Sequence, residues 1–139
     1  MIVFAGMDWI HLIDFGLVIL IWMVQLVVYP SFKYYASSDL LQWHRAYTRG
    51  ITVVVLPLML AQLLLHGWRV YDAPSLPHVC LLVLVVSTWL TTFTIFVPLH
   101  HNIVAEQALS TTLARLVRYN WMRTVLWSVI FLWGLGVHG

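Results

Sequence analysis

The stretch that decides the fold is residues 79–97, VCLLVLVVSTWLTTFTIFV, which contains no charged side chain. A bilayer core about 30 Å thick is crossed by one helix of roughly 20 mostly apolar residues. This stretch therefore predicts a transmembrane helix, and three further stretches of the same kind surround it. The sequence predicts an all-α fold, an integral membrane four-helix bundle that forms a single domain over residues 1–139. The expected helices are residues 9–30, 39–67, 76–101 and 111–137.

The composition agrees with a chain surrounded by lipid. Hydrophobic residues make up 62% of the sequence and charged residues only 9%, whereas soluble domains carry about 25% charged residues. So few charges cannot coat a soluble protein, and membrane lipid is the expected partner of most of the surface. The formal net charge is +2, and no basic run could follow a phosphate backbone, so no nucleic-acid partner is expected.

The basic side chains predict the orientation in the membrane. The connection between the second and third helices has only Arg69, which stands near Asp72, and the other basic residues lie in or beside loops one and three. Positive charge stays on the cytoplasmic side, so these two loops are expected in the cytoplasm and both termini outside (N-out/C-out). The expected location is a bacterial inner membrane. The basic residues in or beside loops one and three are Lys33, Arg45, Arg49, Arg115, Arg118 and Arg123.

Local signals predict where helices end. Pro30 is expected to stop the first helix, because proline lacks the backbone N–H that a helix interior needs. Ser38 or Asp39 is expected to cap the second helix. Pro98 removes one N–H near the end of the third helix, which frees a carbonyl near residue 94.

Polar side chains from all four expected helices gather at the cytoplasmic end. Polar groups inside a membrane are costly, so their convergence indicates a binding site. The structural alternatives are side chains that solvate headgroups and a network that only holds helices together. The candidate catalytic residues are His44, His100, Asn120 and Arg123, and the candidate cofactor- or ligand-binding residues are Gln25, Tyr29, Tyr47, His101 and Asn102.

The histidines allow a cofactor without identifying one. A single haem or metal ion held by His44 with His100 or His101 is compatible with the expected layout. A stacked pair of haems is not, because His44 and His66 are 22 positions apart, which is roughly 33 Å along a helix. A second polar set is expected at the outer side, where imidazole and carboxylate could hold a divalent metal. It lacks a diagnostic ligand spacing, so we interpret it as helix-end solvation and pairing; it comprises His11, Asp14, Gln62, His66 and His78.

Three short elements resemble a known family. They are Gln25-x-x-x-Tyr29-Pro30, then Val97-Pro98-Leu99-His100-His101-Asn102, then Asn120-Trp121-Met122-Arg123-Thr124. They are similar to elements of the small four-helix membrane family that includes the anthrone oxygenases. Where that family commonly has asparagine, this chain has His100. The resemblance implies oxidation of a hydrophobic, enolisable aromatic by O₂ without flavin or nicotinamide, with His44 or His100 as base and with Asn120 and Arg123 stabilising the anion.

Two functions follow from these observations. The first is a small membrane oxidoreductase-like or lipophilic-ligand or cofactor-binding protein, with its site at the cytoplasmic helix ends and a hydrophobic small molecule as partner. The alternative is a non-catalytic accessory subunit of a larger membrane complex, with a pigment, quinone or helix-packing role. In either case the chain is expected to work as a homo-oligomer or beside other subunits.

Overall fold

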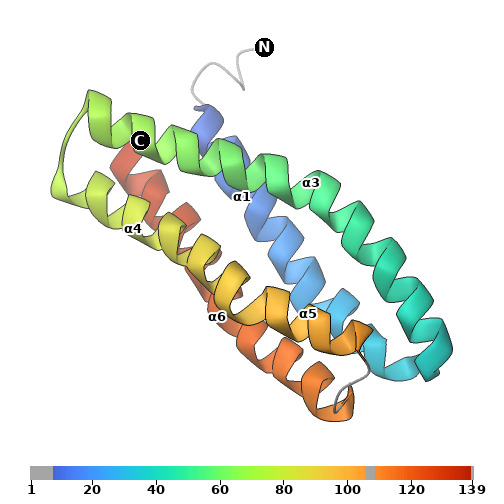
Figure 1. The fold of residues 1–139 in the computed structure, drawn as a ribbon. Coiled ribbons are helices and arrows are strands. Elements are labelled where there is room, and N and C mark those ends of the chain that lie inside the picture. Colours follow the sequence, from blue (N-terminus) through green and yellow to red (C-terminus); the bar gives the residue numbers. More distant parts are fainter. Residues whose placement is uncertain (1–7, 106–108, 139) are drawn as a thin grey trace.

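The computed structural model describes residues 8–105 and 109–138, and nearly all of these are helical. They form four helical rods that run side by side (Figure 1). The first rod joins α1 (Trp9–Met23), η2 (Val24–Val28), α2 (Tyr29–Ser31) and η3 (Phe32–Tyr34), and the second is α3 (Ser37–Asp72). The third joins α4 (Leu76–Thr91), η4 (Thr92–Phe96) and α5 (Val97–Val104), and the fourth is α6 (Leu109–His138).

Three of the rods are long and apolar enough to cross a membrane. They cover Trp9–Tyr34, Ser37–Asp72 and Leu76–Val104, and they make the chain an integral membrane protein. The rod α6 has 30 residues, which is enough length, but Asn120 and Arg123 reduce its apolar character. The all-helical membrane fold is confirmed to this extent, and a fourth crossing stays a prediction.

The packing buries a core of apolar and polar side chains and leaves further apolar side chains on the outer faces. The helix α1 packs against α3 and α6, and α4 packs against the same two, so the rods share one interior. Leu17, Val85 and Ile130 are fully buried there, whereas Val53 and Leu132 on the outer faces are 74% and 66% exposed. Exposed apolar faces suit lipid, because lipid tails are as apolar as leucine.

The first and third rods continue through Pro30 and Pro98, and each has a π-helical turn just before its proline. The expectation that Pro30 ends the first helix is wrong, since the rod continues to Tyr34. The turn η2 stands directly before it, and the Tyr29 N–H bonds to the Val24 carbonyl. The turn η4 stands in the same way before Pro98, with the Val97 N–H on the Thr92 carbonyl. Such turns accommodate the backbone hydrogen bond that a proline cannot donate, and they are frequent at functional sites.

The start of α3 also differs from the expectation. The N-cap is Ala36, and no side chain caps the helix, so Ser38 and Asp39 are not the cap. Both lie inside the first turn, where the carboxylate of Asp39 interacts favourably with the helix dipole. The start of α4 does have a side-chain cap, because the Ser75 hydroxyl accepts a hydrogen bond from the His78 N–H.

Candidate functional site

The two π turns direct a tyrosine and a histidine toward each other at the same end of the rods. Tyr29 follows η2 directly, and His100 lies in α5, one turn beyond η4. The opposite wall comes from α3, which contributes His44 and Tyr47, and Arg123 comes from α6. The structure thus brings together five of the side chains that the sequence singled out.

A hydrogen-bonded chain runs through three of these side chains. The Tyr29 hydroxyl lies 3.1 Å from His100 Nε2, and His100 Nδ1 lies 2.7 Å from His44 Nε2. The two imidazoles are stacked with ring centres 4.9 Å apart. Either all donors point toward His44 or all point toward Tyr29, depending on the histidine tautomers. Reversal of the chain moves a proton from one end to the other, so it is suited to accept or deliver a proton.

Arg123 is a buried cation that forms no ion pair with a carboxylate of the described residues. Its side chain is only 7% exposed, and its guanidinium lies over the rings of Phe96 at 4.4 Å and Trp127 at 4.9 Å. It also interacts with the side chains of Tyr29 and Tyr47. Its Nε has no hydrogen-bond partner in the described part of the chain.

The ion pairs seen in residues 8–105 and 109–138 lie elsewhere. They join His66 to Asp14 and Arg69 to Asp8. A buried charge is ordinarily paired, since removing it from water costs several kcal/mol. Each cation–π contact returns about 2 kcal/mol when it is desolvated. Among the described residues, the guanidinium has no anionic partner.

A cavity of about 270 Å³ lies in front of the guanidinium. It is small for a ligand site but large enough for a molecule of one or two rings. Side chains from all four rods line it, and Arg123 is one of its polar lining residues. The polar lining is Tyr29, Tyr47, Thr48, Thr52, Thr92, His100 and Arg123, and the apolar lining is Leu20, Ile21, Val24, Ile51, Val55, Phe96 and Val97.

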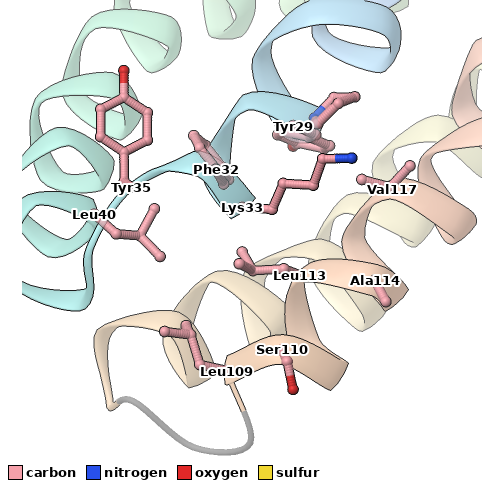
Figure 2. A pocket seen from close by; sticks show the side chains of 11 residues that line it. Tyr29, Phe32, Lys33, Tyr35, Leu40, Leu109, Ser110, Leu113, Ala114 and Val117 are labelled. Carbon is pink, nitrogen blue, oxygen red and sulfur yellow. The ribbon is translucent and has the colours of Figure 1, made fainter.

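A second cavity, of about 330 Å³, lies on the other side of Tyr29 (Figure 2). Its walls are Phe32 and Leu40 on one side and the start of α6, from Leu109 to Val117, on the other. Figure 2 shows the Lys33 side chain reaching toward α6 beside Tyr29. Tyr29 lines both cavities and separates this apolar space from the Arg123 cavity.

Gln25 and Asn120 form a separate network that joins η2 to α6. Gln25 Oε1 accepts hydrogen bonds from Asn120 Nδ2 at 2.9 Å and from the Thr124 hydroxyl at 3.2 Å. Gln25 Nε2 donates to the Val117 carbonyl at 3.1 Å. Neither residue lines the cavity, so their contacts hold two helices together, as amides do in membranes.

We expect Gln25→Leu to destabilise the protein by about 1–3 kcal/mol, because Asn120 and Thr124 lose their buried acceptor. Thermal unfolding in detergent measures this change. Gln42→Leu is the matched control, since Gln42 is exposed on α3, and we expect it to alter stability by less than about 0.5 kcal/mol. Equal effects of the two substitutions would contradict a role for the network.

His101 and Asn102 lie apart from the other candidates. His101 is exposed and Asn102 is half-buried, and neither lines the Arg123 cavity. A haem or metal ion at His44 and His100 would have to separate two nitrogens that are hydrogen-bonded to each other. Within residues 8–105 and 109–138, no three His, Cys, Asp or Glu side chains are placed so that they could hold a metal ion.

Three side chains of the second polar set, at the other end of the rods, are buried and hydrogen-bonded to one another. Asp14 accepts a hydrogen bond from Gln62 Nε2 at 2.8 Å and lies 3.0 Å from His66 Nε2. Their exposures are 1%, 0% and 1%, so the interpretation as helix-end solvation is wrong for these three. Gln62 also accepts a hydrogen bond from Trp127 Nε1 at 3.0 Å.

The two aromatic rings that contact the Arg123 guanidinium, Phe96 and Trp127, were not predicted as part of the site. Trp127 was detectable, because it follows Arg123 by four positions and so shares its helix face. Phe96 was not, because it lies in the π turn η4, where ordinary helical spacing does not apply.

Comparison with protein-family models, with curated proteins and with solved structures finds no match to this chain. The resemblance to the anthrone oxygenase family stays a prediction from short elements, and the chemistry of the site has to carry the functional argument.

Proposed function

We propose that this chain binds a small, weakly acidic lipophilic molecule, such as a phenol or an enolisable ketone, and holds it as its anion beside Arg123. The observation that carries this proposal is the guanidinium, which is 7% exposed, has no carboxylate partner among the described residues and faces a mostly apolar cavity. A phenolate or enolate supplies the missing charge, and its apolar body fills the space between the helices.

The neighbouring hydrogen-bonded chain gives the ligand's proton a destination. Before transfer, the Tyr29 hydroxyl donates to His100 Nε2 and His100 Nδ1–H donates to His44 Nε2, so the Tyr29 oxygen is open to accept the ligand's proton. The transfer passes one proton along the chain to the imidazole pair and reverses it, so that His44 donates to His100, His100 donates to Tyr29, and the Tyr29 O–H donates to the ligand anion. Arg123 and the Tyr47 hydroxyl then stabilise the anion, as donors do at an oxyanion site.

The membrane arrangement belongs to the same proposal. We place all four rods across a bacterial inner membrane as a bundle with both termini outside. Loops one and three, with most of the basic side chains, then lie in the cytoplasm. In this arrangement the Arg123 cavity lies toward the cytoplasmic face, and a lipophilic ligand reaches it from the bilayer.

Oxidation of the bound anion is the reaction that the family resemblance favours. An enolate is electron-rich at carbon and can react there with O₂. A ring CH₂ group becomes C=O and one water is released, so the two atoms of O₂ are accounted for without an external reductant. The residues of this chain supply deprotonation and anion stabilisation, and these steps are required whether or not oxidation follows.

Binding of 4-nitrophenol to the purified protein in detergent tests the proposal, because its phenolate absorbs visible light and its neutral form does not. Below the solution pKa of the dye, we expect the wild-type protein to generate the phenolate band in a saturable way. Arg123→Gln is expected to weaken this binding at least tenfold. Arg118→Gln is the matched control, because Arg118 is exposed on the same helix.

Two results would overturn the proposal. The first is binding of the neutral dye without a phenolate band, and the second is equal phenolate binding by the Arg123→Gln and Arg118→Gln proteins. Tyr29→Phe tests the hydrogen-bonded chain separately from the Arg123 guanidinium. We expect this variant to slow proton release from the dye, while the guanidinium still binds added phenolate at high pH.

A further inference from the structure

The other end of the rods holds a histidine cluster around one carboxylate. His11 comes from α1, His66 from α3, His78 from α4 and His138 from α6. The ring of His138 lies at the centre, 5.9 Å from the ring of His11, 5.5 Å from that of His66 and 5.2 Å from that of His78. Asp14 contacts this group through His66.

Ring nitrogens in this cluster have no partner. His11 Nε2 and both ring nitrogens of His138 are buried and make no hydrogen bond to any described residue. A neutral imidazole has one donor and one acceptor nitrogen, and an unmet buried group costs about 1–3 kcal/mol. Adjacent unmet nitrogens on two helices indicate that a ligand completes the cluster.

The charge of the cluster favours a cation. Asp14 is 1% exposed and contributes a carboxylate, and the basic side chain at this end, Arg69, is paired with Asp8. Asp14 Oδ2 and the His138 ring also face the same point of α6. A Cβ atom at Gly134 would lie 3.7 Å from the carboxylate oxygen and 3.5 Å from the ring.

We propose that this cluster is a binding site for a divalent transition-metal ion such as Zn²⁺, with Asp14, His11, His66 and His138 as ligands. Imidazole nitrogens and one carboxylate oxygen are a typical ligand set for four-coordinate zinc. Metal–nitrogen bonds of about 2 Å leave two imidazole ring centres about 5 Å apart on a tetrahedral ion. The rings around His138 have close to this spacing.

As placed in the structure, no three His, Cys, Asp or Glu side chains of residues 8–105 and 109–138 could hold a metal ion. The proposal therefore requires the imidazoles to rotate about their terminal bonds on binding, and that torsion is broad in histidine. His78 is a positioning residue in this proposal. Its Nδ1–H donates to the Ala73 carbonyl at 2.6 Å, and its ring stacks on His138 at an interplanar angle of 13°.

Zinc titration of the full-length protein in detergent tests the proposal, with a streptavidin-binding tag in place of a histidine tag. A chromogenic chelator as competitor gives the affinity, and elemental analysis gives the stoichiometry. We expect one Zn²⁺ per chain, with affinity at least tenfold lower in His138→Gln and in His11→Gln. His101→Gln, at an exposed position of α5, is expected to bind zinc as the wild type does.

The proposal fails if the wild type retains no stoichiometric zinc, or if His138→Gln and His11→Gln leave the affinity unchanged. A loss of zinc in His44→Gln, but not in His138→Gln, would place the ion at the other end and would also overturn it. His138 is the last residue of α6, so its substitution disturbs the fold little. The result is independent of phenolate binding, which depends on Arg123.

Discussion

Replacing Arg123 with methionine is expected to raise the stability of the ligand-free protein by about 1–4 kcal/mol, although it removes phenolate binding. Replacement of buried ionic groups by apolar residues of similar size commonly has this effect. The guanidinium is 7% exposed and has no carboxylate partner in the described part of the chain. Methionine is unbranched and flexible, so it can fill the space between Phe96 and Trp127.

The sign of this effect follows from the magnitudes. Removing the charge from water costs several kcal/mol even after the protein relaxes. Stacking on the rings of Phe96 and Trp127 returns about 2 kcal/mol for each desolvated contact. The balance favours methionine in the absence of ligand. A residue kept at such a cost is typical of a functional site, where stability and activity are opposed.

Unfolding by SDS in mixed micelles measures this difference, with and without a bound phenolate. Arg118→Met is the control, and we expect it to change the free energy of unfolding by less than about 0.5 kcal/mol because Arg118 is exposed. If Arg123→Met is less stable than the wild type without ligand, the guanidinium is a structural group, and the case for an anion site is lost.

The gathering of polar side chains at one end of the rods was predictable from the sequence. Polar side chains of a membrane helix turn inward because lipid cannot satisfy them. This reasoning predicted that Tyr29, His44, His100 and Arg123 would lie together, and the hydrogen bonds and the shared cavity place them so.

The exact faces of the helices were not predictable. Neighbouring residues on a helix point about 100° apart, so only one of His100 and His101 can face the interior. The π turn η4 inserts a wider turn before this pair and shifts the faces that ordinary spacing would assign. The same effect at η2 carries the first rod past Pro30. A π turn beside a proline changes the spacing at which residues share a helix face. The periodicity of the sequence alone does not reveal where such a turn occurs.

The outer cluster was underestimated for a different reason. His11, Asp14 and His66 were identified by spacing along their own helices, but His138 completes the group from the far end of α6. Whether His138 reaches this group depends on how α6 packs against α1, and the spacing of residues along a single helix does not reveal that packing.

Asp14→Ala is expected to destabilise the protein by about 3–5 kcal/mol, the usual effect of removing one partner from a buried, hydrogen-bonded pair. The carboxylate is the acceptor for Gln62 Nε2 and the partner of His66 Nε2. Gln62 in turn accepts the Trp127 N–H, so the loss reaches α6 as well. Alanine leaves these donors without water or protein partners, and SDS unfolding in the presence of a chelator isolates the protein contribution from any bound metal.

Asp39→Ala is the matched control, because Asp39 is exposed in the first turn of α3. Only its favourable interaction with the helix dipole is lost, so we expect a decrease of about 0.3–1 kcal/mol. Asp14→Asn should fall between the two, because the amide oxygen still accepts from Gln62 while the charge is lost. If Asp14→Ala and Asp39→Ala unfold at the same SDS concentration, the buried carboxylate does not organise this end of the rods, and neither the pairing nor a metal site at Asp14 can be maintained.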